Sequence, residues 1–190
     1  MKPLWTLFCL LLLTNPLSAE IEKVVVGYTA SLCDQKCMDF TKRQFELIPE
    51  VANVQVTPGQ VILDWKPKSK FSFQTINYTM RRIGLGMANT SVTARGTIQK
   101  QGDKLYLVSI GDNTRFRIVN PPAPESGSYV EYNNIAMYEL LPGVRDALET
   151  AMRKDQLVTV AGYLLAPWRY ELTIVLGNYR VEDEEEEEKQ

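Results

Sequence analysis

The order of apolar periodicities in the first half of the chain restricts its fold more than any other feature. Short runs of β-branched and aromatic residues, which predict strands, alternate with two longer stretches whose apolar residues recur at helical spacing. The predicted elements are a strand at residues 23–28, a helix at 38–48, strands at 53–57 and 61–65, a helix at 72–83, and a strand that begins near residue 88 and runs through 92. This order predicts two helices packed on an antiparallel sheet.

Such an arrangement is a ferredoxin-like sandwich, which we expect over residues 20–91. The second helix stops at Gly84, and glycine commonly ends helices. The first helix has four apolar side chains available for its inner face: Phe40, Phe45, Leu47 and Ile48. The predicted fold class is therefore α+β.

Strand signals dominate the second half of the chain. Runs at residues 92–99, 104–110 and 115–119 are joined by glycine-containing turns that suit hairpins. A proline-rich stretch follows, and then a helix at 144–154 and strands at 157–165 and 170–181. Three strands, a helix and two strands are the order of an OB-fold barrel, which we expect over residues 92–181. The fourth sandwich strand passes into the first barrel strand without a linker.

Two cysteines mark the junction between the first strand and the first helix. Cys33 and Cys37 are separated by three residues, and the third cysteine of the chain, Cys9, lies near its start. A helix N-terminus stabilises negative charge, so a thiol pair at this place favours thiolate chemistry. Soft-metal binding, a structural disulfide and thiol exchange are all open to such a pair.

Residues 22–92 resemble the heavy-metal-associated domain family of copper chaperones and transport-ATPase modules. The resemblance rests on the cysteine pair at the first strand-to-helix junction, the passage from Pro49 to Val54 into the second strand, and the Ile83-Gly84 end of the second helix. It implies that Cys33 and Cys37 hold a soft ion, usually Cu(I), between two thiolates. Two thiolates suffice for linear Cu(I) but leave zinc two ligands short, and the chain has no histidine. The family has two residues between its cysteines, whereas this chain has three.

Residues 1–19 predict a secretory signal peptide. Lys2 supplies the positive charge, residues 4–13 form a short apolar segment, and a small-residue site ends at Ala19. Cys9 would leave with this peptide. No later segment approaches the roughly 20 apolar residues of a membrane span, so we expect a soluble protein that is periplasmic or secreted. In an oxidising compartment the remaining two cysteines are free to form a disulfide.

Charge and composition argue against several function classes. The formal net charge of -2 reflects an unbroken acidic run at residues 182–188, and we expect a disordered acidic tail over residues 182–190. Without this run the body is only slightly basic, which does not fit a nucleic-acid binder. The chain has no histidine, nucleophile elbow or phosphate-binding glycine loop. We therefore expect a binding protein and not an enzyme, with no cofactor other than a soft metal.

The predicted barrel offers a second candidate site. OB-fold barrels bind oligonucleotides, oligosaccharides or other ligands on one strand face, with the loop between the last two strands as a wall. Aromatic residues beside arginines can stack on a ligand and pair with it. Seven residues are candidates on this ground: Tyr106, Arg115, Phe116, Arg117, Trp168, Arg169 and Tyr170. The alternative is that Phe116 belongs to the barrel interior and the arginines to its wet face.

Three functional hypotheses follow from the sequence. The first is soft-metal binding by Cys33 and Cys37. The second is an interaction module in which these cysteines form a structural disulfide and the barrel recognises a protein or a saccharide. The third is a thiol-exchange enzyme, which the spacing of the cysteines and the order of the strands support least.

Overall fold

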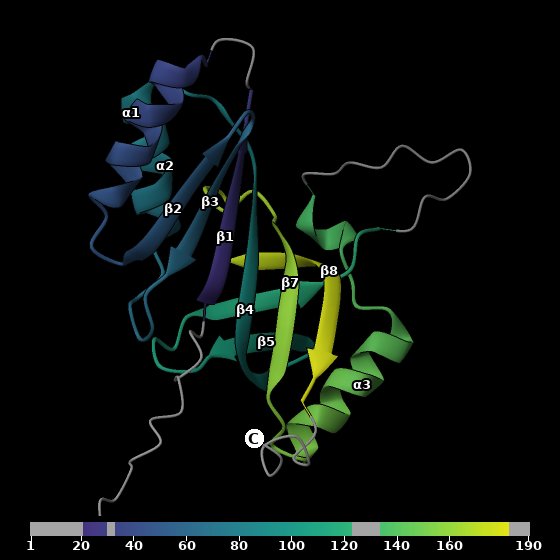
Figure 1. Cartoon of the computed structure of the whole chain (residues 1–190). Coiled ribbons are helices and arrows are strands. Elements are labelled where there is room, and N and C mark those ends of the chain that lie inside the picture. Colours follow the sequence, from purple (N-terminus) through teal and green to yellow (C-terminus); the bar gives the residue numbers. More distant parts are fainter. Residues whose placement is uncertain (1–20, 30–32, 123–133, 183–190) are drawn as a thin grey trace, which may run out of the picture.

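The protein has a mixed α+β fold in the computed structural model, which describes residues 21–29, 33–122 and 134–182 (Figure 1). The predicted signal peptide and residues 183–190 of the predicted acidic tail lie outside these ranges. The described residues form three α-helices, one 3-10 turn and eight strands. No helix in these ranges is long and apolar enough to cross a membrane.

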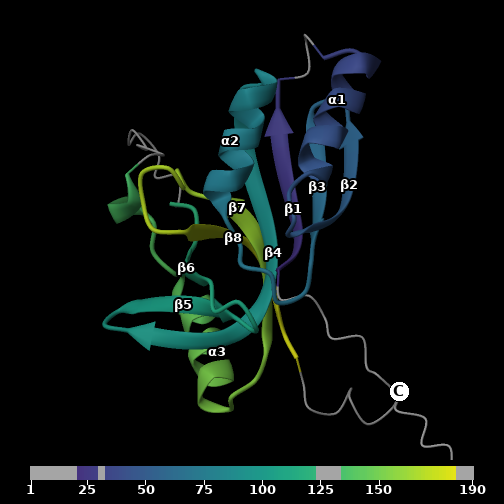
Figure 2. The same cartoon turned by 90° about the vertical axis from the view of Figure 1, so that its left-hand side faces the viewer.

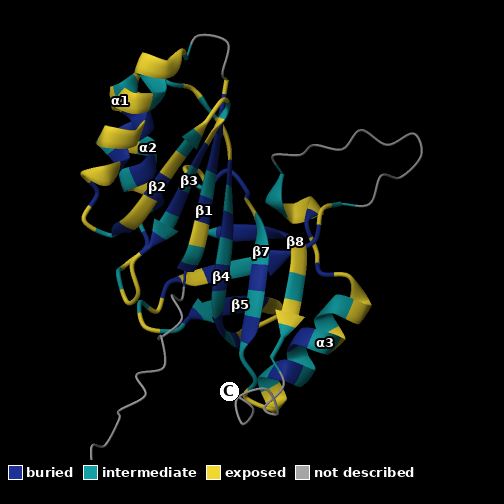
Figure 3. Cartoon of the chain, viewed as in Figure 1, coloured by how far each residue is buried: buried dark blue, intermediate teal, exposed yellow. Residues whose placement is uncertain are grey.

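The first half is a four-stranded antiparallel sheet with two helices on one face. Its elements are β1 (Ile21–Tyr28), α1 (Gln35–Glu46), β2 (Val51–Thr57), β3 (Gln60–Trp65), α2 (Phe73–Ile83) and β4 (Met87–Gln101). The strands lie in the order β2-β3-β1-β4. Figures 1 and 2 show α1 and α2 on the same side of this sheet, and Figure 3 shows that the outer side of α1 is exposed.

The inner face of α1 differs from the sequence prediction. Phe40 is 43% exposed and Leu47 is 68% exposed, so both were wrongly assigned to that face. The buried residues of this segment are Thr41, Phe45 and Ile48. Side chains three or four residues apart share one face of a helix, and Phe40 lies one residue away from the stripe that these three define. Leu47 is the C-cap of α1 and follows its last turn.

The second half forms a closed five-stranded barrel. Its further elements are β5 (Lys104–Ser109), β6 (Arg115–Val119), the 3-10 turn η2 (Ile135–Met137), α3 (Pro142–Arg153), β7 (Val158–Leu164) and β8 (Thr173–Val181). The strand order is β4-β5-β6-β8-β7, and β4 pairs with β7 to close the barrel. β6 and β8 run parallel, whereas the other neighbours are antiparallel. This topology is consistent with an OB-like fold.

A single strand, β4, belongs to both halves, as expected from the missing linker. It pairs with β1 in the sandwich and with β5 and β7 in the barrel. At Gly96 it meets both barrel neighbours, and a Cβ there would lie 2.1 Å from the carbonyl oxygen of Val108. Glycine therefore allows β4 to approach β5 closely at this corner. The shared strand gives the halves a common backbone and one relative orientation.

The two halves also share one hydrophobic core. A continuous cluster of buried apolar side chains extends from the sandwich into the barrel, and α3 contributes Leu148 and Ala151 to it. Phe71, in the loop before α2, bridges the two parts. Its ring centroid lies 5.5 Å from that of Trp65 in the sandwich and 5.7 Å from that of Phe116 in the barrel. Burial of aromatic rings across the junction stabilises the relative placement of the halves.

Asp112, in the turn between β5 and β6, makes a polar connection across the same junction. Its carboxylate accepts hydrogen bonds from the Ser109 hydroxyl at 2.5 Å, from the backbone N–H and the hydroxyl of Thr114, and from the backbone N–H of Phe71 at 3.0 Å. Burial acts to raise the pKa of this carboxyl, but the hydrogen bonds outweigh it and lower the pKa below 3.8. The ionised side chain thus holds the turn against the loop before α2.

Glu182 corrects the predicted start of the acidic tail. Its backbone N–H donates to the carbonyl of Leu157, and its carboxylate accepts bonds from Arg95 on β4 and Thr159 on β7. The hydrogen bonds from Arg95 are the main cause that lowers the pKa of Glu182 from 4.5, with burial acting in the opposite direction. The Glu182 carboxylate therefore binds side chains of the barrel and does not belong to the predicted solvated acidic tail.

Candidate functional site

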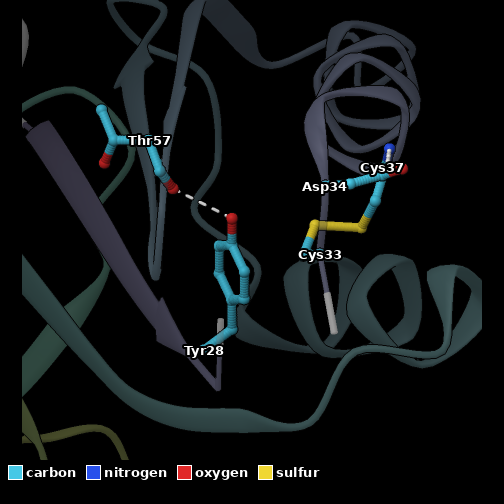
Figure 4. The surroundings of a disulfide bond; sticks show 5 residues. All are labelled: Tyr28, Cys33, Asp34, Cys37 and Thr57. Atoms are coloured by element: carbon cyan, nitrogen blue, oxygen red, sulfur yellow. Dashed lines mark hydrogen bonds between the residues drawn. A yellow bond between two sulfur atoms is a disulfide. The ribbon is translucent and has the colours of Figure 1, made fainter. Parts of the chain in front are cut away.

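The cysteine pair lies at the N-terminus of α1, where it forms a disulfide (Figure 4). The Cα atoms of Cys33 and Cys37 are 5.1 Å apart. The helix begins at Gln35, earlier than predicted, because Asp34 caps it: the Asp34 carboxylate accepts a hydrogen bond from the backbone N–H of Cys37 at 2.9 Å. The disulfide and the cap therefore constrain the same turn.

The residues around the disulfide make packing contacts and hydrogen bonds that hold the fold together. Cys33 is partly buried against the hydrophobic core. The hydroxyl of Tyr28, at the end of β1, donates to the carbonyl of Thr57 on β2 at 2.9 Å (Figure 4). Since each sulfur is bonded to the other, this form offers no thiolate to a soft ion. In the described part of the chain no group of three or more His, Cys, Asp or Glu side chains is suited to a metal ion. The soft-metal prediction thus concerns the reduced protein.

The outer face of β5 and β6 brings together several of the predicted ligand residues. Tyr106 on β5 lies opposite Arg117 on β6, and the guanidinium of Arg115 lies 4.5 Å from the Tyr106 ring centroid. The Tyr106 hydroxyl donates to the Glu171 carboxylate at 3.3 Å. Phe116, which was also predicted here, alternates to the inner face of β6 and is fully buried in the core.

The polar side chains on this outer face of β5 and β6 already form hydrogen bonds and ion pairs with one another and with neighbouring residues. Lys104 lies 3.4 Å from the Glu171 carboxylate, and Arg115 donates to the side chain of Gln101 at 3.0 Å. Tyr106 is buried beneath these side chains. The stacking surface that the sequence predicted at Tyr106 is therefore already covered by Arg115.

The other predicted ligand residues lie on the loop between β7 and β8. The loop turns at Ala166, whose carbonyl accepts the backbone N–H groups of Arg169 at 2.8 Å and Tyr170 at 3.2 Å. The Arg169 guanidinium lies 5.4 Å from the Tyr170 ring centroid. Trp168 is 69% exposed, and its ring centroid lies 6.4 Å from that of Phe73 at the start of α2. The β7–β8 loop of the barrel thus places Trp168 next to α2 of the first half.

A cleft in two parts opens beside Trp168, between the two halves. One part has a volume of about 240 Å³ and lies between the start of β4 and the end of β7 with its loop. Its walls include Met87, Asn89, Thr90, Tyr163, Leu165 and Trp168. The other part, of about 310 Å³, is lined by Asn77, Met80 and Arg81 of α2 together with Met87 and Trp168. Met87 and Trp168 separate the two parts.

The local courses of β4 and β7 explain why the cleft forms. The pairing of β4 with β7 starts at Ser91↔Tyr163, so the residues of β4 before Ser91 have no register partner in β7. β7 ends at Leu164, and the next residue, Leu165, donates its N–H to the carbonyl of Thr173, the first residue of β8. β7 therefore turns away from β4 and leaves space over the first residues of β4.

Among the residues that the structure describes, Arg81 is the single charged one that lines either part of the cleft. Sequence reasoning identified Trp168 but missed Arg81, Met87 and Tyr163. Basic residues in the last turn of a helix are common because they complement its dipole, so Arg81 gave no distinct signal. The cleft depends on contacts between segments that are far apart in the chain, and no local pattern predicts it.

Comparison with known proteins gave no match to any family model, to any curated protein or to any solved structure.

Proposed function

We propose that the protein is an exported, non-catalytic binding protein whose ligand, a protein or a saccharide, occupies the cleft beside Trp168. In this proposal the first half is a ferredoxin-like sandwich and the second an OB-like barrel, which the two strand orders support. The Cys33–Cys37 disulfide is structural and closes a small loop, which contributes about 2 kcal/mol in the loop-entropy model.

The observation that carries the proposal is the position of Trp168. Trp168 is 69% exposed, yet the loop holds it at the boundary of a cleft that both halves form. Burial of a tryptophan side chain is strongly favourable, so a ligand that covers the exposed Trp168 ring gains a large binding free energy. Tyr163 and Asn89 add an aromatic and an amide residue to the walls. Clefts of this composition are typical of ligand sites.

The test is a paired screen of the purified, oxidised protein against a peptide library and a glycan array. We expect ligands of one class to be retained, and Trp168→Ala to weaken their binding by about tenfold or more, as for a central aromatic contact. Tyr78→Ala is the matched control, because Tyr78 on α2 is 65% exposed but lines neither part of the cleft. Equal retention by the wild type and Trp168→Ala would contradict the proposal.

Soft-metal binding is the second candidate function. What favours it is the placement of two sulfurs within bonding distance at a helix N-terminus, where thiolates are stabilised after reduction. Two thiolates suit Cu(I), which prefers sulfur and accepts linear coordination. This candidate requires that the disulfide be reduced in the compartment where the protein acts.

A further inference from the structure

The first residues of β4 present an unpaired backbone edge to the cleft. On one side of the strand, β1 pairs with it at Gly27↔Asn89 and Tyr28↔Met87. On the other side, the register with β7 begins only at Ser91↔Tyr163. Among the described residues no strand pairs with Met87–Asn89 on that second side. Since successive residues of a strand direct their N–H and C=O groups to alternate sides, at least one residue here presents both groups to the cleft.

The free edge lies where an added strand would continue the existing sheet. β7 pairs with this side of β4 only between Ser91 and Gly96, while its own other side pairs with β8 from Val158 to Leu164. An extended peptide in the cleft could therefore continue the backbone hydrogen bonding along this side of β4, beginning where the pairing with β7 ends. Unpaired strand edges bind extended peptides through main-chain hydrogen bonds.

The two parts of the cleft fit the side chains of such a peptide. They lie on either side of Met87 and Trp168, and their volumes are about 240 and 310 Å³. An apolar cavity of about 150 Å³ already accepts a benzene ring, so each part has room for a large apolar side chain. Met80 and Met87 suit such contacts because the flexible thioether adapts to varied shapes.

Charge adds a further element of recognition. Arg81 lines the part of the cleft next to α2, and no described acidic residue lines either part. Among the described residues its guanidinium has no hydrogen bond or ion pair, in contrast to Arg82, which donates to Gln44 and lies over the Tyr78 ring. A carboxylate on the ligand would give Arg81 a charge-assisted partner.

We infer that the ligand of the cleft is an extended peptide that adds to the free edge of β4. Its backbone bonds to Met87–Asn89, apolar side chains occupy the spaces on either side of Trp168, and an acidic group pairs with Arg81. This inference rests on the proposed function and names the ligand class of the same site, with saccharide as the competing class.

The test uses a positional-scanning library of acetylated pentapeptide amides together with a glycan array. We expect retained peptides to combine apolar residues with Asp or Glu at a fixed spacing. Methylation of one backbone nitrogen should weaken the best peptide by about tenfold, while methylation of its neighbours should not, because only alternate N–H groups face β4. Arg81→Gln should weaken acidic peptides several-fold and leave their Asn or Gln analogues unchanged, and Arg82→Gln is the matched control.

The outcomes separate this inference from the proposed function. Retention of glycans alone, lost in Trp168→Ala, would overturn the peptide inference and leave the proposed function standing. Peptide binding that tolerates methylation at every nitrogen would overturn strand addition while the cleft remains a ligand site. If neither library is retained, both proposals fail.

Discussion

The contact between Glu182 and the barrel gives a sharp prediction. The Glu182 carboxylate accepts two bonds from Arg95 Nε, at 2.8 and 3.0 Å, and one from Thr159 Oγ1 at 3.1 Å. A further ion-pair contact joins it to the terminal nitrogen of the Arg95 guanidinium. Glu182→Gln keeps the size of the side chain and one acceptor oxygen but removes the charge. We therefore expect it to destabilise the protein.

The magnitude follows from the partial burial of the pair. The Arg95 and Glu182 side chains are 19% and 23% exposed. A buried hydrogen bond to a charged group contributes about 1.5–3 kcal/mol, whereas an exposed ion pair contributes about 0–1 kcal/mol. We expect an intermediate loss in the free energy of unfolding of about 1–2 kcal/mol, which lowers the melting temperature by about 3–6 °C in a domain of this size.

The same contact predicts a pH dependence with a definite sign. The pKa of Glu182 is lowered in the folded state from 4.5, so folding favours the ionised carboxylate. Its contribution is fully present above pH 4.5 and is lost as the pH falls from 4.5 through the folded-state pKa. The stability difference between the wild type and Glu182→Gln should therefore shrink below pH 4.5.

The measurement is urea denaturation of the oxidised protein at pH 7 and at several values below 4.5, followed by far-UV circular dichroism. Glu184→Gln, a change of the same kind within the acidic run, is the control and should alter stability by less than about 0.5 kcal/mol. Glu182→Gln with wild-type stability at pH 7, or a stability gap that does not narrow in acid, would refute the reasoning.

Four further predictions concern other parts of the fold. Asp112→Asn should lower the free energy of unfolding by about 2 kcal/mol in urea titrations, because the buried N–H of Phe71 loses a charged acceptor. Thr41→Val should raise it by about 1 kcal/mol, since the buried Thr41 hydroxyl has no hydrogen-bond partner among the described residues. Replacing Cys33 and Cys37 by serine should lower it by about 2 kcal/mol, and a fully retained stability would contradict a structural disulfide. The anaerobically reduced wild type should bind one Cu(I) per chain by metal analysis and Cys33→Ser none; binding unchanged by that substitution would exclude the pair as the metal site.

Local periodicity was enough to predict the order of the elements, because each strand or helix depends mainly on its own apolar pattern. The first helix shows where this reasoning ends. Residues 35–37 are Gln, Lys and Cys, so its first turn carries no apolar signal, and only the cap at Asp34 marks its start. The inner face was also misassigned, because it includes the polar Thr41, which apolar periodicity does not select, and leaves Phe40 exposed.

The candidate site was less predictable than the fold. The sequence identified Trp168 as a ligand residue, but Met87 and Arg81 became part of the site only because the pairing of β7 with β4 ends at Ser91 and leaves the first residues of β4 without a partner in β7. Glu182 was assigned to the tail by its acidic neighbours, whereas its partner Arg95 lies on a strand far away in the chain. Contacts of this type are set by tertiary packing and leave no periodic trace.

The strand shared by the two halves has a consequence for synthesis. The sandwich strands are complete once β4 has been made, but β7, which seals the other edge of β4, is among the last segments translated. At about 5–20 residues per second, a nascent chain holds this long strand with an open flank for several seconds. An open flank of that length invites pairing with neighbouring chains. A chaperone that shields nascent strands should therefore raise the yield of this protein.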